Sequence, residues 1–241
     1  MEKAINLIVF LAITYPLGII LGVIFHILRI LKVISVLHWG RFPHWQRKII
    51  LVSNHPSLLE PVLLPLLFFR EYLFYPLKFV PWSTPDQKNF YDPWYWFWLR
   101  PRMIPIDRSS ERKELQSLFQ MKRILNSGGI IILFAEGGRT YLGESFLYSQ
   151  KGKRIRILKG GLGWLVLKTK ATVLPVWIEG ADKFLPPADS PDKLFSWPNL
   201  QEKVAIKIGK PLKFEGSPAV GREMATQMVA NALLKLADEE E

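Results

Sequence analysis

A histidine and a glutamate stand five positions apart in the segment VSNHPSLLEP at residues 52–61, where an apolar run ends. The run predicts a buried strand, and α/β folds place binding and catalytic groups at the carboxyl ends of such strands. A carboxylate that accepts a hydrogen bond from one nitrogen of His55 would fix the tautomer, so that the other nitrogen could take a proton. Glu60 is the candidate for that carboxylate.

Helix geometry alone does not bring these two side chains together. Five residues on a regular helix span about 140° of rotation, which puts them on different faces. They can meet if His55 lies in the loop after the strand and Glu60 lies in the first turns of the following helix. The alternative is that His55 caps the helix and Glu60 lies on its surface, with no shared chemistry.

A second candidate site is the segment LFAEGGRTY at residues 133–141, where another predicted strand ends. Gly137 and Gly138 allow backbone amides to approach an anion closely, and Arg139 can bind a phosphate through both arms of its guanidinium. Glu136 could hold Arg139 in place or accept a hydrogen bond from a hydroxyl. The spacing differs from that of a nucleotide-binding P-loop. The alternative is an ordinary turn between strand and helix, in which the glycines serve only the backbone.

Two shorter segments are weaker signals. IPIDRSS at residues 104–110 ends a short predicted strand with Asp107 and Arg108, which form either a solvated charge pair or a second arm on a phosphate. TVLPVWIEG at residues 172–180 predicts a strand, and Pro175 within it indicates an edge strand or the wall of a pocket, with plain core as the alternative.

The N-terminal region indicates attachment to a membrane. Residues 4–28 contain no Asp, Glu, Lys or Arg, and a helix that crosses a bilayer needs about 20 apolar residues. Pro16 could split the run into two short helices. His26, Arg29 and Lys32 follow at intervals of three, which makes a polar stripe typical of a helix that lies in the membrane interface.

The orientation follows from the charges around this segment. No acidic residue occurs between Glu2 and Glu60, and the basic residues there would keep the following domain on the cytoplasmic face of the cell membrane. A cleaved signal peptide is a competing interpretation, but the apolar run is long and lacks a clear small-residue cleavage site. A buried hairpin of a soluble core is the other alternative.

Composition narrows the chemistry further. The chain of 241 residues has a formal charge of +11 together with 49% hydrophobic residues, which favours an anionic lipid surface over nucleic acid as the partner. There is no cysteine, so disulfides, thiolate metal sites and a cysteine nucleophile are excluded. The four histidines have no zinc-ligand spacing, and we expect no metal.

Strands and helices alternate along the rest of the chain, which indicates an α/β domain. Strands are predicted at residues 47–54, 77–82, 102–107, 129–135, 172–178 and 203–212. Helices are predicted at residues 55–71, 92–100, 109–126, 161–170 and 219–239. We expect a membrane-anchoring helical segment at residues 1–38, with one broken or two short helices, and one α/β domain at residues 39–241. The aromatic segment at residues 94–98 is predicted as core packing, with a wall of a lipid site as the alternative.

Four segments, in this order, resemble the sequence blocks of the glycerolipid acyltransferases, most closely the bacterial 1-acylglycerol-3-phosphate acyltransferases. NHPSLLE, IPIDR, FAEGGRT and LPVWIEG stand where that family has N-H-x-x-x-x-D, F-I-D-R, F-P-E-G-T-R-S and V-P-V. The resemblance covers about residues 50–180, and its first and third blocks are the specific ones. It implies a single domain with a mixed sheet flanked by helices, of the glycerol-3-phosphate acyltransferase type.

The resemblance also implies roles for individual residues. His55 matches the catalytic histidine of the family, and Glu60 stands in place of its aspartate with one more methylene. The residues that match the substrate-binding positions for the phosphate and glycerol of the acceptor are Arg108, Glu136, Gly137 and Arg139, with Thr140 for the usual serine and Lys159 as a basic position after the third block. Ala135 replaces the usual proline and Gly138 the usual threonine, which predicts a looser phosphate loop.

The implied reaction moves an acyl group from a thioester of coenzyme A or of acyl carrier protein to the free hydroxyl of a lysophospholipid. Lysophosphatidic acid (1-acylglycerol-3-phosphate), which gives phosphatidic acid, is the expected acceptor, with no cofactor beyond the donor. Glycerol-3-phosphate or a lyso-aminolipid are alternative acceptors. A catalytically inactive membrane protein that binds anionic lipid is the alternative from another class.

Overall fold

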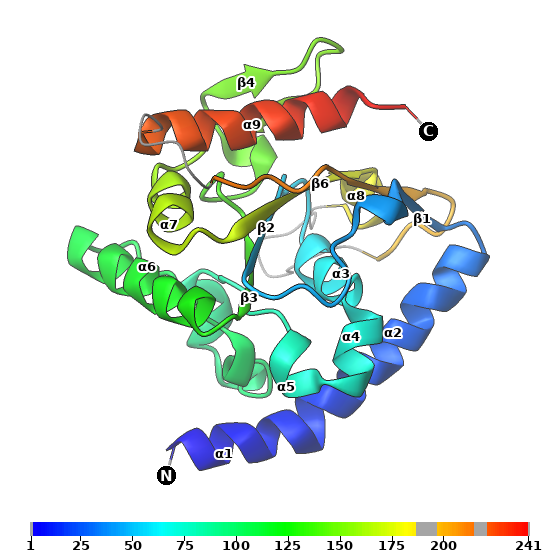
Figure 1. Cartoon of the computed structure of the whole chain (residues 1–241). Coiled ribbons are helices and arrows are strands. Elements are labelled where there is room, and N and C mark those ends of the chain that lie inside the picture. Colours follow the sequence, from blue (N-terminus) through cyan, green and yellow to red (C-terminus); the bar gives the residue numbers. More distant parts are fainter. Residues whose placement is uncertain (1, 187–196, 215–220, 241) are drawn as a thin grey trace.

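The computed structural model describes residues 2–186, 197–214 and 221–240, and it is built around a five-stranded sheet (Figure 1). The strands are β1 (Ile34–Leu37), β2 (Ile49–Ser53), β3 (Ile130–Leu133), β6 (Thr172–Glu179) and β7 (Val204–Ile208). Their order is β1-β7-β6-β2-β3; β6 and β7 are antiparallel, and the other neighbouring pairs are parallel. The sheet is therefore mixed, as the resemblance implied.

Both faces of the sheet are covered, because β2 is apolar at every position but its last and buried along its whole length. Ile49 and Leu51 join the core beneath α2 and α3, while Ile50 and Val52 join the core beneath α6, α7 and α9. The helices are α2 (Tyr15–Ile30), α3 (Glu60–Leu66), α4 (Phe69–Phe74), α5 (Pro76–Phe79), α6 (Glu111–Asn126), α7 (Gly161–Thr169), α8 (Ala181–Phe184) and α9 (Arg222–Asp238). The layers confirm the predicted class, helices on both sides of a mixed sheet.

The N-terminal apolar segment is one helix rather than two. It comprises α1 (Glu2–Val9), a π-helical turn (Phe10–Thr14) and α2, and its stretch Ala4–Ile30 is long and apolar enough to cross a membrane. A proline inside an α-helix removes an N–H and collides with the carbonyl four residues earlier. The π turn directly before Pro16 widens the helix there, so that the chain passes the proline without a break.

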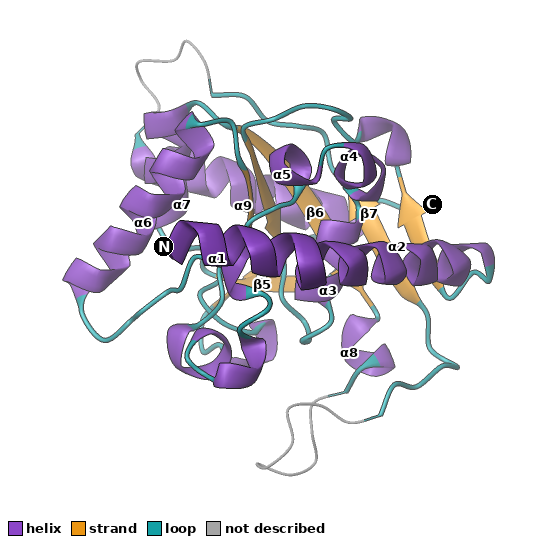
Figure 2. Ribbon diagram, turned by 90° about the horizontal axis from the view of Figure 1, so that it is seen from below, coloured by secondary structure: helices purple, strands orange, loops and turns teal. Residues whose placement is uncertain are grey.

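This long helix lies against the domain along α2 (Figure 2). Gly18 and Gly22 face α4 so closely that a Cβ on them would lie 2.0 Å from Tyr72 Oη and from the ring of Phe69, respectively. The Tyr72 hydroxyl also donates to the carbonyl of Tyr15 over 2.5 Å. The division of the chain at residue 38 stays a prediction, and β1 lies before that position although it pairs with β7.

Several predicted elements were wrong, and prolines explain most of the differences. Residues 77–82 hold α5 and a single bridge at Trp82 instead of a strand, because Pro76 starts a helical turn. Residues 92–100 hold a short 3-10 turn (Trp94–Trp96) and reach a second one (Arg100–Arg102) instead of a helix. Residues 102–107 make only isolated bridges. The strand with Pro175 is central, not at an edge.

The sequence-based prediction missed three short strands. One is β1, at the edge of the main sheet, and the other two form a hairpin, β4 (Phe146–Tyr148) and β5 (Arg154–Arg156). Each is three or four residues long, too short for a periodic pattern to stand out. The C-terminal helix begins at Arg222, and the first residues predicted for it, 219–220, lie outside the described part of the chain.

Candidate active site

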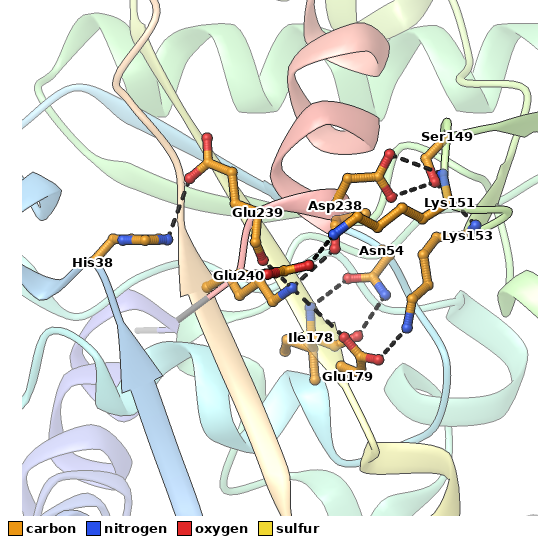
Figure 3. Close-up of polar contacts among 12 residues, drawn as sticks. His38, Asn54, Ser149, Lys151, Lys153, Ile178, Glu179, Asp238, Glu239 and Glu240 are labelled. Carbon is orange, nitrogen blue, oxygen red and sulfur yellow. Dashed lines mark hydrogen bonds and ion pairs between the residues drawn. The ribbon is translucent and has the colours of Figure 1, made fainter.

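The carboxyl end of β2 is clamped to β6 by Asn54. Its side-chain amide donates to the carbonyl of Ile178 over 2.8 Å, and the Ile178 N–H donates back to its Oδ1 over 2.8 Å (Figure 3). Asn54 is buried, so this pair of bonds is shielded from water. The next residue, His55, therefore leaves the sheet at a defined position.

His55 and Glu60 do meet, through a turn rather than a helix. The Nδ1 of His55 lies 2.8 Å from Oε2 of Glu60, whose side chain is 0% exposed. Helix α3 begins at Glu60 itself, and its other carboxylate oxygen accepts from the N–H and the hydroxyl of Ser57 over 2.9 and 2.8 Å. A carboxylate accepts, so it holds His55 with the proton on Nδ1 and leaves Nε2 free to accept a proton.

Two consequences follow for neighbouring residues. The extra methylene of Glu60, compared with aspartate, is absorbed by the turn, because the carboxylate reaches His55 and Ser57 together. The Ser57 hydroxyl is buried and donates to that carboxylate, which leaves it no role as an exposed nucleophile. The ring of His55 stacks on Phe134, with centroids 4.2 Å apart, which fixes its plane.

Glu136 connects the first and third sequence blocks through hydrogen bonds to its side chain. It is buried, and its carboxylate accepts from the N–H of His55 (3.0 Å), the hydroxyl of Thr140 (2.8 Å) and the N–H of Arg156 (2.8 Å). Burial raises the pKa of Glu136 above the ordinary carboxyl value, and these donors offset part of that rise. The Thr140 N–H in turn donates to the carbonyl of His55 over 2.9 Å.

Two of the predicted anion-binding residues, Arg139 and Arg108, line the cavity, and Lys159 does not. Arg139 lines the cavity beside His55 and lies over the ring of Tyr141. Arg108 lines it too, but its guanidinium is 3.4 Å from the carboxylate of Asp86. Lys159 packs its side chain against Gly137, which has a φ of 73° that suits glycine.

Four of the predicted substrate-binding residues do not line the cavity. The cavity lining does not include Glu136, Gly137, Thr140 and Lys159. Contact of these four with a substrate therefore stays a prediction, and the contacts of Glu136 and Thr140 are those of residues that shape the loop.

The cavity itself has a volume of about 1100 Å³ and is mostly apolar. His55, Arg108 and Arg139 form part of its polar lining. Its apolar walls come from α2, α3 and the aromatic segment 94–98, through residues such as Leu17, Leu21, Val62, Tyr95, Trp96 and Trp98. Core packing was thus the wrong interpretation of that segment, and Trp94 is 77% exposed. Such a space suits a ligand with a polar head and a long apolar part.

Sequence reasoning missed two residues near the site. Phe134 lies in the third sequence block without a role of its own there, and Arg156 lies outside all four blocks. Among the described residues, no group of three or more metal-ligating side chains was found.

A cavity-lining histidine held by a buried glutamate, a glycine loop with an arginine and a mostly apolar cavity form one site on a mixed α/β sheet. The family model for Acyltransferase matches residues 34–179, and the chain belongs to this family. The resemblance seen in the sequence is thereby confirmed, as is the class of enzyme.

The fold is also similar to a solved structure. The crystal structure of the 1-acyl-sn-glycerophosphate (LPA) acyltransferase, PlsC, from Thermotoga maritima matches with a TM-score of 0.60. The two chains are 19% identical, and the match covers 94% of this chain and 81% of that one. This likeness extends the shared architecture beyond the family match, into the N-terminal helix and the C-terminal part of the chain.

Proposed function

We propose that the protein transfers an acyl group from a thioester to the free hydroxyl of a lysophospholipid, with 1-acylglycerol-3-phosphate as the acceptor and phosphatidic acid as the product. The observation that carries the proposal is the His55–Glu60 pair on the wall of a cavity that also holds Arg139 and a long apolar interior. The donor is acyl-coenzyme A or acyl-acyl carrier protein, and no further cofactor takes part.

His55 acts as the general base in this reaction. Its Nε2 takes the proton of the acceptor hydroxyl while the oxygen attacks the thioester carbonyl. The tetrahedral intermediate collapses, the C–S bond breaks, and the thiolate takes the proton back from Nε2. Glu60 keeps the ring in the required tautomer and stabilises the imidazolium; general base catalysis of this kind contributes about 10²–10⁴ in rate. A thioester is already activated, so no acyl-enzyme is needed.

Arg139 binds the acceptor phosphate, and Arg108 assists it. A guanidinium matches the geometry of two phosphate oxygens, and Arg139 has no carboxylate partner among the described residues that would compete for it. Arg108 has to give up part of its contact with Asp86 to do the same. The apolar walls of the cavity take the acyl chains.

The long N-terminal helix holds the enzyme at the membrane, lying along the bilayer surface. Gly18 and Gly22 pack one side of α2 against α4, whereas Ile20, Ile24 and Ile27 on α2 are exposed. Exposed apolar side chains continue onto the neighbouring α4 and α5, for example Phe74 and Leu77. A helix fastened lengthwise to the domain is suited to immersion in one leaflet, and this supports a surface position over a crossing.

The basic residues that flank the helix support a position at the cytoplasmic face, where anionic lipids attract them. Arg29 and Lys32 stand at its end, and no acid interrupts the positive charge until Glu60.

The test is an acyl-transfer assay with a panel of acceptors. Purified protein in mixed micelles is given labelled acyl-coenzyme A or acyl-acyl carrier protein with lysophosphatidic acid, glycerol-3-phosphate or a lyso-aminolipid. We expect product with lysophosphatidic acid and a loss of about 10²–10⁴ in kcat for His55→Ala. Equal product from wild type and His55→Ala would remove the general base. A wild type without product on any acceptor would favour a protein that only binds lipid.

A further inference from the structure

Arg156, at the end of β5, runs its side chain between two glycines. A Cβ on Gly138 would lie 2.7 Å from Nη1 of Arg156, and a Cβ on Gly143 would lie 2.6 Å from its Cγ and 2.8 Å from Nε. Contacts under 3.0 Å are too close for real atoms, so both positions must lack a side chain if Arg156 is to stay where it is. The guanidinium is therefore held against the glycine loop that follows β3.

The backbone around Arg156 is held as firmly as its side chain. Its N–H donates to the buried carboxylate of Glu136, which also accepts from His55. The hairpin that carries it is tied down at its other end, where the Ser149 hydroxyl donates to Asp238 over 2.7 Å and Lys153 pairs with Glu179 (Figure 3). Arg156 is thus placed by the same framework that places the catalytic histidine.

The guanidinium itself has no acceptor in the part of the chain that the structure describes. No carboxylate there forms an ion pair with it, and the hydrogen bond of Arg156 to Glu136 uses only the backbone N–H. The side chain is half-buried. A guanidinium offers five N–H donors, and none of those of Arg156 is used by another group in the described chain. An anionic group from outside the chain would satisfy them.

Gly138 connects this guanidinium to the cavity, because it lines the cavity next to Arg139. Threonine is usual at this position in the resembling family, and a threonine here would displace Arg156. The glycine at position 138 thus leaves room for the Arg156 guanidinium where the family has a threonine.

We infer that Arg156 binds a phosphate group of a substrate beside Gly138, together with Arg139. The inference rests on the proposed function and deepens it, since it names a phosphate-binding residue that the sequence motifs do not contain. Arg139 and Arg156 together offer a phosphate more free N–H donors than Arg139 and Arg108 do, because the guanidinium of Arg108 is paired with Asp86. The phosphate belongs either to the acceptor head group or to the phosphopantetheine arm of the donor.

The experiment measures binding, so that it does not depend on turnover. Titration calorimetry compares hexanoyl-lysophosphatidic acid with monohexanoylglycerol, and 4′-phosphopantetheine with pantetheine, so that the members of each pair differ only in one phosphate. The variants are Arg156→Met, which removes the charge, and Gly138→Thr, which displaces the guanidinium but keeps it in the protein. Arg154→Met is the matched control: it lies in the same strand and is exposed, over the ring of Phe146.

We expect both test variants to weaken binding of one phosphate-bearing probe by about 10- to 100-fold, because a hydrogen bond to a charged group contributes about 1.5–3 kcal/mol. The affinity of Arg154→Met for every probe should stay within about twofold of the wild type, because an exposed charge contributes little. The affinity of the two test variants for the probes without phosphate should also stay within about twofold. A loss with lysophosphatidic acid assigns the phosphate to the acceptor, and a loss with 4′-phosphopantetheine assigns it to the donor.

Unchanged affinity of Gly138→Thr and Arg156→Met for both phosphate-bearing probes would overturn the inference, even if the wild type turns over lysophosphatidic acid. If Arg156→Met does not fold, Gly138→Thr with Arg156→Lys decides the question, because lysine keeps the charge but not the fork. A wild type that binds phosphate through Arg156 but makes no product would instead count against the proposed function alone.

Discussion

The carboxylate of Glu60 lies 2.8 Å from Nδ1 of His55 because helix α3 starts at Glu60 rather than at the histidine. A helix that ran through both residues would have turned them apart by about 140°. The turn formed by residues 55–59 brings the carboxylate back beside the imidazole, and Ser57 supplies two more donors that hold it there.

The length and charge of Glu60 can be separated by substitution. Glu60→Gln keeps the length but presents an amide N–H₂ and a single carbonyl where three donors converge, so the His55 tautomer is no longer enforced. We expect a loss of about 10²–10⁴ in kcat with little change in KM. Glu60→Asp keeps the charge, and the turn can shift to bring it closer, so its loss should be much smaller. Equal losses in steady-state kinetics would contradict an orienting role.

The packing of the long helix against α4 depends on glycine. Gly22→Ala would place a methyl group 2.0 Å from the ring of Phe69, and the crowding should lower the free energy of unfolding by about 1–3 kcal/mol. Gly40→Ala is the control, because nothing lies within 4 Å of a Cβ at Gly40. Denaturant titration in detergent measures both. Equal stability of the two variants would mean that the helix does not pack on the domain in this way.

The outer side of the same helix should decide membrane binding. Ile24→Glu and Ile27→Glu put charge on exposed apolar positions of α2, and we expect the fraction bound to anionic vesicles to fall at least about tenfold, because each charge costs more than 1.4 kcal/mol to immerse. Met224→Glu and Met228→Glu change equally apolar exposed positions on α9, away from this helix (Figure 1), and should bind as the wild type does. Release of the wild type by high salt alone would indicate surface charge instead of insertion.

Burial of Glu136 gives stability a pH dependence of predictable sign. Because burial raises the pKa of Glu136 in the native state, the native state binds more protons than the unfolded state between the ordinary carboxyl pKa and the native one. This group's contribution to stability is therefore complete below the ordinary value and is lost as pH rises through that window. Glu136→Gln should lack this slope when unfolding is measured from pH 4.5 upward, relative to the wild type. Parallel pH profiles for the two proteins would show that the pKa of Glu136 is not raised in the native state.

Sequence patterns predicted the buried strands β2, β3 and β6 and the helices α6, α7 and α9, because their apolar residues repeat with the period of the element over enough residues. Periodicity gave wrong elements at residues 77–82 and 92–102, where prolines and aromatic residues interrupt the periodic pattern. The order of the strands in the sheet could not be predicted either. Pro175 indicated an edge strand, yet β6 is central. The carbonyl of Pro175 accepts a hydrogen bond from the N–H of Gly209, and the N–H that a proline lacks does not interrupt the pairing of β6 with its two neighbours.

The chemistry of the site was set by residue types that the sequence displays directly. An imidazole with a carboxylate five residues later suggests a general base, and a glycine loop with an arginine suggests an anion site; acyl transfer is what the resemblance of these segments to the acyltransferase blocks implies. Tertiary structure alone decided which of these groups meet. Glu136 lies under His55, 81 positions away, and Arg156 reaches Gly138 from a hairpin that no local pattern announces. Such contacts depend on how distant segments pack, and side-chain packing leaves no periodic trace in the chain.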